Sequence, residues 1–272
     1  MRLAFIGGGH MATSLIGALC ARGLEPASII VAEPVTPRRE ALARDYGVGT
    51  TEDNAAAARA ADVLVIAVKP QDVREVAANI AAAIADRRRL VVSVAAGIRL
   101  ADLGRWLRAG AALVRAMPNQ PALIGRGITA LCAGPGVSAA ERARAESILA
   151  ASGETLWIEP ESLLDVVTAV SGSGPAYFFL LMEALAEAGR AQGLPADVAR
   201  RLAVVTAAGA GEMAAAADVP PAVLREQVTS QGGTTAAALA VLDAADLRGI
   251  FLAAVAAATR RAAELAAQSG AQ

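Results

Sequence analysis

The chain has 272 residues, of which 55% are hydrophobic and 3% aromatic, and its formal net charge at pH 7 is −1. This length gives room for one large or two medium domains with hydrophobic cores. The near-zero charge excludes the broadly basic surface of a nucleic-acid-binding protein, so we expect no nucleic-acid partner. Cys20 and Cys132 exclude a disulfide framework and lack metal-ligand spacing, so we expect no bound metal and small, buried thiols.

Strands and helices alternate through the first part of the chain. Predicted strands lie at residues 3–6, 28–32, 63–67, 90–94, 112–116, 128–132 and 154–158. This alternation predicts an α/β fold that begins with a Rossmann-type, doubly wound, mainly parallel sheet over residues 1–158. The basic run at 87–89 is expected to be a solvated helix end.

The remainder, residues 159–272, is predicted to be an all-α domain. Glycine and proline separate the expected helices, which lie at 163–170, 175–192, 195–217, 221–227, 235–244 and 247–267. Because alanine-rich helices bury little surface each, we expect this domain to form a homodimer or a higher homo-oligomer. Charges such as Glu183 and Glu187 interrupt the apolar runs and argue against a membrane span. No signal peptide is evident, so we expect a cytoplasmic protein.

The first strand runs directly into a glycine motif, Gly7-Gly-Gly9-His-Met-Ala12, and then into a helix. This is the GxGxxA dinucleotide-binding fingerprint in its strand-turn-helix context, with Gly7 for the tight turn and Gly9 for the approach of the pyrophosphate. The alternative is a glycine turn without a ligand. His10 and Met11 are candidate cofactor contacts beside it, although His10 could equally face solvent.

Ligands of such sheets bind at the carboxyl ends of the strands. Three turns follow predicted strands there, and they supply further candidate cofactor contacts: Ala67, Val68, Lys69, Pro70, Ala95 and Asn119. Lys69 could contact the cofactor or substrate, or it could be solvated. The Ser171-to-Pro175 segment could also face the nicotinamide, or it could simply cap the next helix.

The most specific segment is Val228-Thr-Ser-Gln-Gly-Gly-Thr-Thr235, where two glycines stand before a predicted helix. Paired glycines and a helix start can aim backbone N–H groups at one small anion, such as a carboxylate. The plain alternative is a helix cap after a turn. The helical half contains no lysine or histidine, because the only ones in the chain are Lys69 and His10. A keto- or hydroxy-acid dehydrogenase usually needs such an acid-base group, whereas a cyclic imine needs only hydride and a hydrogen bond.

The segment from Leu224 to Asp243 resembles the signature of the pyrroline-5-carboxylate reductase family. Pieces in the family's order are Gly7–Ala12, Ala67–Pro70, Ser93–Gly97, Arg115–Asn119 and Ser171–Tyr177, so that the resemblance covers essentially the whole chain. Departures are small: Gln231 replaces the common proline before the glycines, Gln120 replaces a common threonine, and His10 lies at a variable position.

The resemblance implies an enzyme that reduces L-1-pyrroline-5-carboxylate to L-proline with hydride from NAD(P)H, the last step of proline biosynthesis. Its implied substrate site is the backbone of Gly232, Gly233 and Thr234 with the Ser230 hydroxyl, which would hold the carboxylate. Thr235 would orient the ring nitrogen. Ser230 and Thr235 are the implied catalytic residues.

The choice of cofactor depends on the end of the second strand. Glu33 would accept hydrogen bonds from an adenine ribose and repel a 2′-phosphate, which favours NADH. Arg38 and Arg39 could pair with that phosphate, and Asn54 matches a position on the ribose side in the family. We expect NADPH, with NADH usable. The alternatives are another two-domain NAD(P)-dependent dehydrogenase or imine reductase, and a non-catalytic nucleotide-binding relative.

Overall fold

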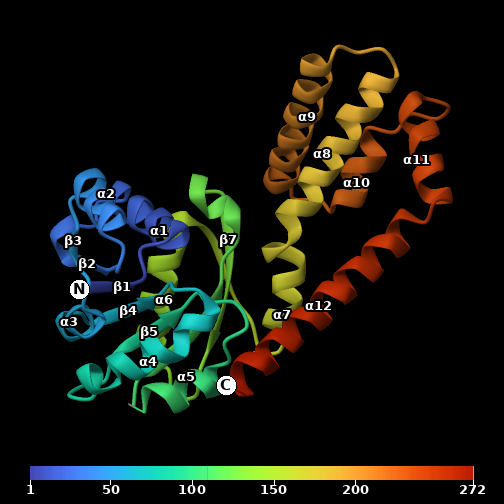
Figure 1. Ribbon diagram of the computed structural model, residues 1–272. Coiled ribbons are helices and arrows are strands. Elements are labelled where there is room, and N and C mark those ends of the chain that lie inside the picture. Colours follow the sequence, from blue (N-terminus) through green and yellow to red (C-terminus); the bar gives the residue numbers. More distant parts are fainter. Residues whose placement is uncertain (109, 272) are drawn as a thin grey trace. The chain divides into compact units, whose positions relative to one another are not determined.

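The computed structural model describes residues 1–108 and 110–271, and it divides the chain into two compact units (Figure 1). Unit 1 comprises Met1–Gly172 together with Ala258–Gln272, and unit 2 comprises Ser173–Ala257. The chain therefore leaves unit 1 later than the boundary predicted at residue 158. It also returns to unit 1 at its C-terminal end, which the sequence pattern does not predict.

Unit 1 is built on one eight-stranded sheet with the order β3-β2-β1-β4-β5-β6-β7-β8. The pairing is parallel except between β6 and β7, so that the predicted Rossmann-type, mainly parallel sheet is confirmed. The strands are β1 Leu3–Ile6, β2 Ile29–Ala32, β3 Gly49–Thr51, β4 Val63–Ile66, β5 Leu90–Ser93, β6 Ala112–Met117, β7 Gly127–Ala133 and β8 Gly153–Trp157. Strand β3 was not predicted, because three residues beginning with glycine carry no apolar alternation.

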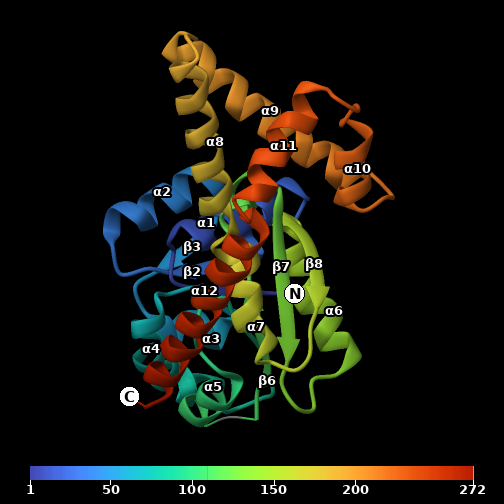
Figure 2. The ribbon, with the colours of Figure 1, turned by 90° about the vertical axis from the view of Figure 1, so that its right-hand side faces the viewer.

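Helices cover both faces of this sheet. Alternate residues of each central strand point to opposite faces, and the buried side chains accordingly form two separate clusters. On one face lie α1 His10–Ala21, α2 Thr36–Tyr46 and α6 Ala139–Leu149; on the other lie α3 Asn54–Ala60, α4 Val73–Ala81 and α5 Leu100–Leu107. Figure 1 shows α1 and α2 on one side of the strands and α4 and α5 on the other. Strands β7 and β8 extend the sheet with α6 beside them (Figure 2).

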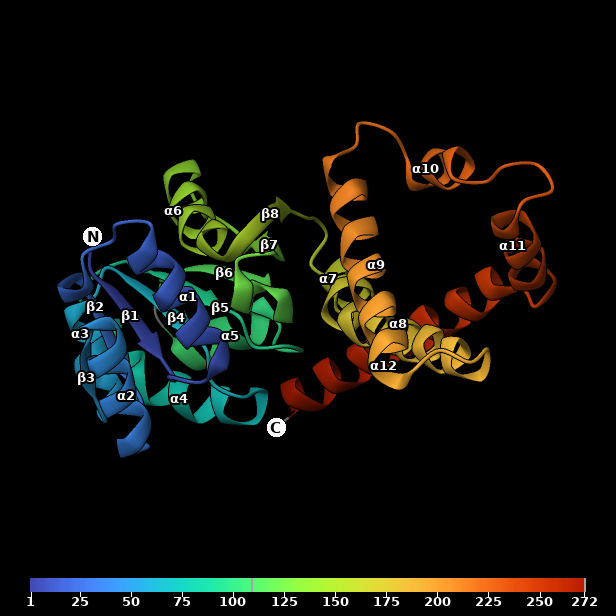
Figure 3. The same cartoon turned by 90° about the horizontal axis from the view of Figure 1, so that it is seen from above.

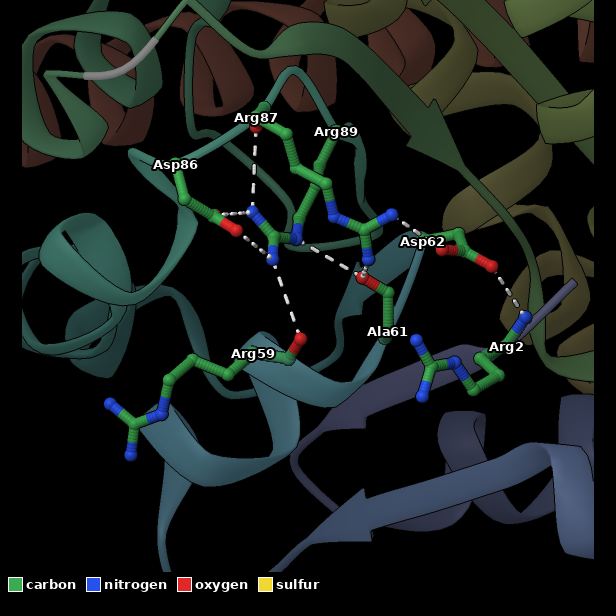
Figure 4. A network of polar contacts seen from close by, with 7 residues as sticks. All are labelled: Arg2, Arg59, Ala61, Asp62, Asp86, Arg87 and Arg89. Atoms are coloured by element: carbon green, nitrogen blue, oxygen red, sulfur yellow. Dashed lines mark hydrogen bonds and ion pairs between the residues drawn. The ribbon is translucent and has the colours of Figure 1, made fainter.

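The basic run at residues 87–89 forms part of an internal network (Figure 4). Arg89 is only 3% exposed; it donates to the Ala61 carbonyl at 3.1 Å and pairs with Asp86. Arg87 donates to the same carbonyl at 3.0 Å and to Asp62 at 2.9 Å. Both guanidinium groups thus bind the Ala61 carbonyl, just beyond the end of α3. The predicted solvated helix end is therefore wrong for Arg89.

A second buried ion network joins β6 to α7 (Leu163–Val167). Arg115 on β6 is 1% exposed; it donates to Glu161 at 3.0 Å and lies 3.7 Å from Asp165. Arg99 donates to the other oxygen of Asp165 at 2.6 Å. Glu161 also accepts the backbone N–H of Leu100, at the start of α5. Two arginines and two carboxylates thus hold α7 against the sheet.

The last part of α12 (Leu247–Ala271) packs on unit 1. Gly97, with φ +72°, lies so close that an added Cβ would be 3.5 Å from the backbone nitrogen of Ala266. Ala262 and Ala266 are buried, and Arg105 donates to the Gly270 carbonyl at 3.1 Å. Small alanine side chains permit this close approach. The contact explains why residues from 258 onward belong to unit 1.

Unit 2 consists of helices: α8 Gly174–Ala191, α9 Ala196–Ala216, α10 Pro221–Gln227, α11 Thr234–Ala244 and the first part of α12. Figure 1 shows α8 and α9 side by side, and Figure 3 shows α10 on the connection from α9 to α11. Large apolar side chains of this unit are exposed, among them Phe178, Phe179, Leu202 and Val205. Within the described residues one helical stretch, Leu163–Ala191, is long and apolar enough to span a membrane, which alone is weak evidence for a span.

Candidate functional site

The glycine turn after β1 has the geometry that the fingerprint predicts. Gly7 has φ +100° and donates its N–H to the Ala32 carbonyl at 2.8 Å. A Cβ on Gly7 would lie 2.9 Å from the Ala67 carbonyl carbon, so no other residue fits. Gly9 is the N-cap of α1, and an added Cβ there would meet nothing within 4 Å. The turn therefore leaves open space above Gly9, where a phosphate group could approach the backbone.

A cavity of about 410 Å³ opens beside this turn. It brings together the predicted residues Gly9, His10, Met11, Arg38, Ala67, Val68 and Lys69, and it is completed by Gly8, Thr13, Ala41, Leu42, Asp45 and Tyr46. The N-terminal end of α1 contributes N–H groups that have no acceptor within the helix. A helix N-terminus next to a lysine, an arginine and a histidine suits an anionic ligand such as a pyrophosphate.

Glu33, at the end of β2, is bound to the glycine turn. Its side chain is 5% exposed; one carboxylate oxygen accepts the Gly8 N–H at 2.9 Å and the other accepts the Val35 N–H at 3.0 Å. Arg38 lies 3.8 Å from this carboxylate, and its own side chain is 61% exposed. Glu33 therefore lies beside the glycine turn, with Arg38 at the solvent side.

Arg39 has a different environment from Arg38. Its guanidinium donates to the carbonyls of Glu33 and Pro34 at 2.7 and 2.8 Å and to the Thr36 hydroxyl at 3.0 Å. It also lies 3.6 Å from Glu52, and its side chain is 17% exposed. Arg39 therefore holds the turn between β2 and α2.

The other predicted cofactor contacts do not line this cavity. Pro70 lines a smaller one, of about 300 Å³, with Gly97 and Thr168. Ala95 is buried. The side-chain oxygen of Asn119 accepts the Ile128 N–H at 2.9 Å, which fixes the connection between β6 and β7. Asn54 is the first residue of α3, next to the cap residue Asp53. Each stands at the carboxyl end of a strand or just beyond it.

Sequence reasoning did not single out Gly8, the middle residue of the glycine run. An added Cβ would lie 2.8 Å from Cδ1 of Leu42 and 3.1 Å from Cβ of Glu33. The fingerprint requires glycine only at positions 7 and 9. The additional glycine at position 8 was therefore the sequence signal that this position also has no room for a side chain. Asp45 and Tyr46 of α2 were also missed, since their approach to the turn depends on how α2 packs against α1.

The loop before α11 lies on unit 2 and leads, as predicted, into a helix that starts beside the two glycines. Gly232 has φ +71° and Gly233 is the N-cap of α11. Ser230 is exposed, Thr235 is half-buried, and the first-turn N–H groups of α11 have no acceptor within the helix. The Gly233 N–H donates to the Ser230 carbonyl at 3.0 Å. Of the three backbone groups expected to hold an anion, this one is thus engaged within the loop.

Neighbouring hydroxyls are engaged in local contacts. The Ser171 hydroxyl donates to the Val167 carbonyl at 3.1 Å, and the Thr229 hydroxyl donates to the Arg225 carbonyl at 2.6 Å. The ring of Tyr177 stands edge-on to Phe251, with centroids 6.4 Å apart. In unit 1, burial raises the pKa of the Cys20 and Cys132 thiols, which keeps both protonated. Ser230, Thr234 and Thr235 remain the hydroxyl-bearing candidates at the helix start.

Comparison with known proteins covers both units. The family described as pyrroline-5-carboxylate reductase dimerisation matches residues 161–265, and the family described as NADP oxidoreductase, coenzyme F420-dependent, matches residues 2–97. A pyrroline-5-carboxylate reductase of Pseudomonas aeruginosa is 46% identical over 99% of this chain and 98% of its own length.

Solved structures of pyrroline-5-carboxylate reductases also resemble this chain. A pyrroline-5-carboxylate reductase of Coxiella burnetii superposes with a TM-score of 0.94 at 39% identity, covering 97% of this chain and 98% of that one. The Plasmodium falciparum pyrroline carboxylate reductase with NADP bound superposes with a TM-score of 0.84 at 27% identity, covering 98% of both chains. The similarity extends over the sheet, the glycine turn and the loop before α11. The chain therefore belongs to the pyrroline-5-carboxylate reductase family of oxidoreductases.

Proposed function

We propose that this protein reduces L-1-pyrroline-5-carboxylate to L-proline, the last step of proline biosynthesis, with NADPH as its preferred cofactor and NADH as a usable alternative. The observation that carries the proposal is the segment 224–243, which comprises the end of α10, the loop before α11 and most of α11, in a chain 46% identical to a pyrroline-5-carboxylate reductase over nearly its full length. A location in the cytoplasm fits a biosynthetic enzyme of this kind.

The cofactor would occupy the cavity of unit 1. Gly9 leaves space for the pyrophosphate, the α1 N-terminus and Lys69 complement its charge, and His10 lies beside them. The relative from Plasmodium falciparum, whose structure holds NADP, supports the choice of dinucleotide. When bound, the reduced nicotinamide supplies the hydride that the imine carbon accepts.

The substrate carboxylate would bind at the start of α11 on unit 2. Thr234 and Thr235 begin this helix, and its first-turn N–H groups and positive dipole end favour an anion. Gly232 in its left-handed conformation turns the chain into this position, and the exposed Ser230 hydroxyl can donate a further hydrogen bond. Gly233 shapes the loop through its bond to the Ser230 carbonyl.

The half-buried Thr235 would orient the ring nitrogen by a hydrogen bond. If the imine arrives protonated, addition of hydride to its carbon gives the neutral secondary amine and no strong acid is needed. Positioning of this kind can contribute several kcal/mol by fixing a near-attack geometry. The absence of lysine and histidine from unit 2 is compatible with such a reaction.

The test is to mix the purified protein with pyrroline-5-carboxylate and NADPH, follow the loss of nicotinamide absorbance and identify the product. We expect proline to form at a rate above that of the mixture without enzyme. Thr235→Ala should lower kcat by about tenfold or more, on the magnitude of a lost positioning hydrogen bond. Thr234→Ala, which keeps the backbone N–H, is the matched control and should retain most of the turnover. Cofactor consumption without proline would reject the proposed substrate.

We propose that the protein forms a homo-oligomer and that unit 2 supplies the interface between subunits. The family match there is described as a dimerisation domain, and the unit exposes large apolar side chains on α8 and α9. A groove of about 810 Å³ on the same unit is lined by four leucines, Phe251, Val255 and Ala256 together with the charged residues Arg225, Asp243 and Arg248. Sedimentation should give a homodimer or larger species at micromolar concentration, and a monomer there would reject this proposal.

A further inference from the structure

The end of β2 carries two opposing charges whose geometry bears on cofactor choice. Glu33 is negative, almost fully buried and bound by two backbone N–H groups. Arg38 is positive and largely exposed, and it lines the cavity at the glycine turn. In dinucleotide-binding sheets this position faces the adenine ribose, whose 2′ substituent is a hydroxyl in NADH and a phosphate in NADPH.

Glu33 is held in place rather than free to reorient. Because its two oxygens accept N–H groups from Gly8 and Val35, at 2.9 and 3.0 Å, moving the carboxylate away would leave two amides without acceptors. Its negative charge therefore stays next to the glycine turn whichever cofactor binds. A 2′-phosphate binding here needs a nearby cation to offset the repulsion.

Arg38 is the arginine available for that role. Arg39, its neighbour, is 17% exposed and donates to two carbonyls and a hydroxyl, which leaves it committed to the β2–α2 turn. Arg38 is 61% exposed, lies 3.8 Å from Glu33 and borders the cavity. A guanidinium can bind a phosphate through paired N–H donors, which a point charge cannot match. The other charged residues that line this cavity are Asp45 and Lys69, and the imidazole of His10 lies there too.

We propose that Arg38 is the residue that selects NADPH over NADH, by pairing with the 2′-phosphate. Fixed Glu33 limits this preference because it repels the same phosphate and can accept a hydrogen bond from the 2′-hydroxyl of NADH. The pair thus keeps both cofactors usable. The inference rests on the proposed use of a nicotinamide dinucleotide but not on the identity of the reduced substrate.

Binding of adenine nucleotide fragments tests this without any turnover. The full chain is titrated calorimetrically with 2′,5′-ADP, which carries the 2′-phosphate, and with 5′-AMP, which lacks it. We expect the wild-type protein to bind 2′,5′-ADP more tightly. Arg38→Ala should weaken 2′,5′-ADP binding by about tenfold or more and change 5′-AMP binding by less than about twofold, on the magnitude of a charge-assisted hydrogen bond.

Arg44→Ala is the matched control, because Arg44 also lies on α2, is exposed and pairs with its neighbour Asp45. It removes the same charge from the same helix and should leave the ratio of the two affinities unchanged. Equal binding of the two fragments by the wild-type protein would overturn the proposal. So would an unchanged ratio in Arg38→Ala, or an equal change in Arg44→Ala. If the ratio changes as expected while no imine is reduced, the cofactor inference survives and the proposed substrate fails.

Discussion

Glu141 offers a test of how one surface cluster contributes to stability. It sits in the first turn of α6, where a capping box links its carboxylate to Ser138. Arg88 donates to both carboxylate oxygens, at 2.8 and 3.2 Å, and the Ser138 N–H and hydroxyl donate at 2.8 and 2.9 Å. These bonds, that from Arg88 foremost, lower the pKa of Glu141 from 4.5 to about 2.

The direction of the pH dependence of stability follows from the difference between the folded-state and unfolded-state pKa of Glu141. The carboxylate is favoured in the folded state, so its contribution to stability is present above pH 4.5 and is lost as the pH falls towards 2. At about 1.4 kcal/mol per pKa unit, the full shift would correspond to roughly 3 kcal/mol. Because the Arg88 side chain is 49% exposed, solvent screening reduces the contribution. We expect about 1 kcal/mol at neutral pH.

The assay compares urea unfolding midpoints of the wild-type protein and Glu141→Gln from pH 7 to pH 2.5 at fixed protein concentration. Glutamine keeps the size and the cap geometry but removes the charge. The wild-type protein should be more stable by about 1 kcal/mol at pH 7, and the two midpoints should converge as the pH falls below 4.5. A difference that stays constant down to pH 2.5 would refute the assigned cause. Arg88→Gln should converge only in part, because Arg88 also donates to the Gly136 carbonyl at 2.7 Å, and that bond does not depend on the charge of Glu141.

Three further substitutions test other parts of unit 1. Gly153→Ala should destabilise the protein by about 3 kcal/mol or more, because φ is +149° and the new Cβ would overlap the Gly127 carbonyl; an unchanged melting temperature would contradict this. Arg115→Met should cost about 3 kcal/mol in a urea titration, since it removes the buried guanidinium that pairs with Glu161 and Asp165 and leaves Asp165 with Arg99; an unchanged unfolding midpoint would contradict this. Gly9→Ala has room to fold and should keep the wild-type melting temperature while weakening NADPH binding in a fluorescence titration; equally tight binding would remove Gly9 from the pyrophosphate site.

Much of the sheet could be predicted because its strands are continuous apolar runs buried on both faces, as in β1 and β4. The glycine turn could also be predicted, since Gly7 and Gly9 follow a strand and precede a helix. Strand β3 carried no such pattern. The attachment of Ala262 and Ala266 to unit 1 was also hidden, because alanines that contact a distant glycine look the same in sequence as alanines that face a neighbouring helix.

The candidate site likewise has residues that could be predicted from the sequence and residues that could not. Gly7 and Gly232, which have positive φ, and Gly9, which leaves open space, were predicted because glycine spacing indicates where a side chain is not tolerated. Which of two neighbouring charged side chains faces the cavity could not be predicted from the sequence. Arg38 and Arg39 are adjacent in the sequence, and only their contacts distinguish an exposed guanidinium beside the cavity from one bound to two carbonyls. The N–H of Gly233 likewise proved to be engaged within its own loop.

The return of α12 to unit 1 makes unit 2 an insertion rather than an appendage. Because residues from 258 onward complete the cover of Gly97, a fragment ending at Gly172 would contain all eight strands of the described sheet and yet expose surface that the whole chain buries. Excising unit 2 would instead require a linker from residue 172 to residue 258. A gene fusion or deletion intended to isolate the nucleotide-binding half should therefore keep both ends of the chain and replace its middle.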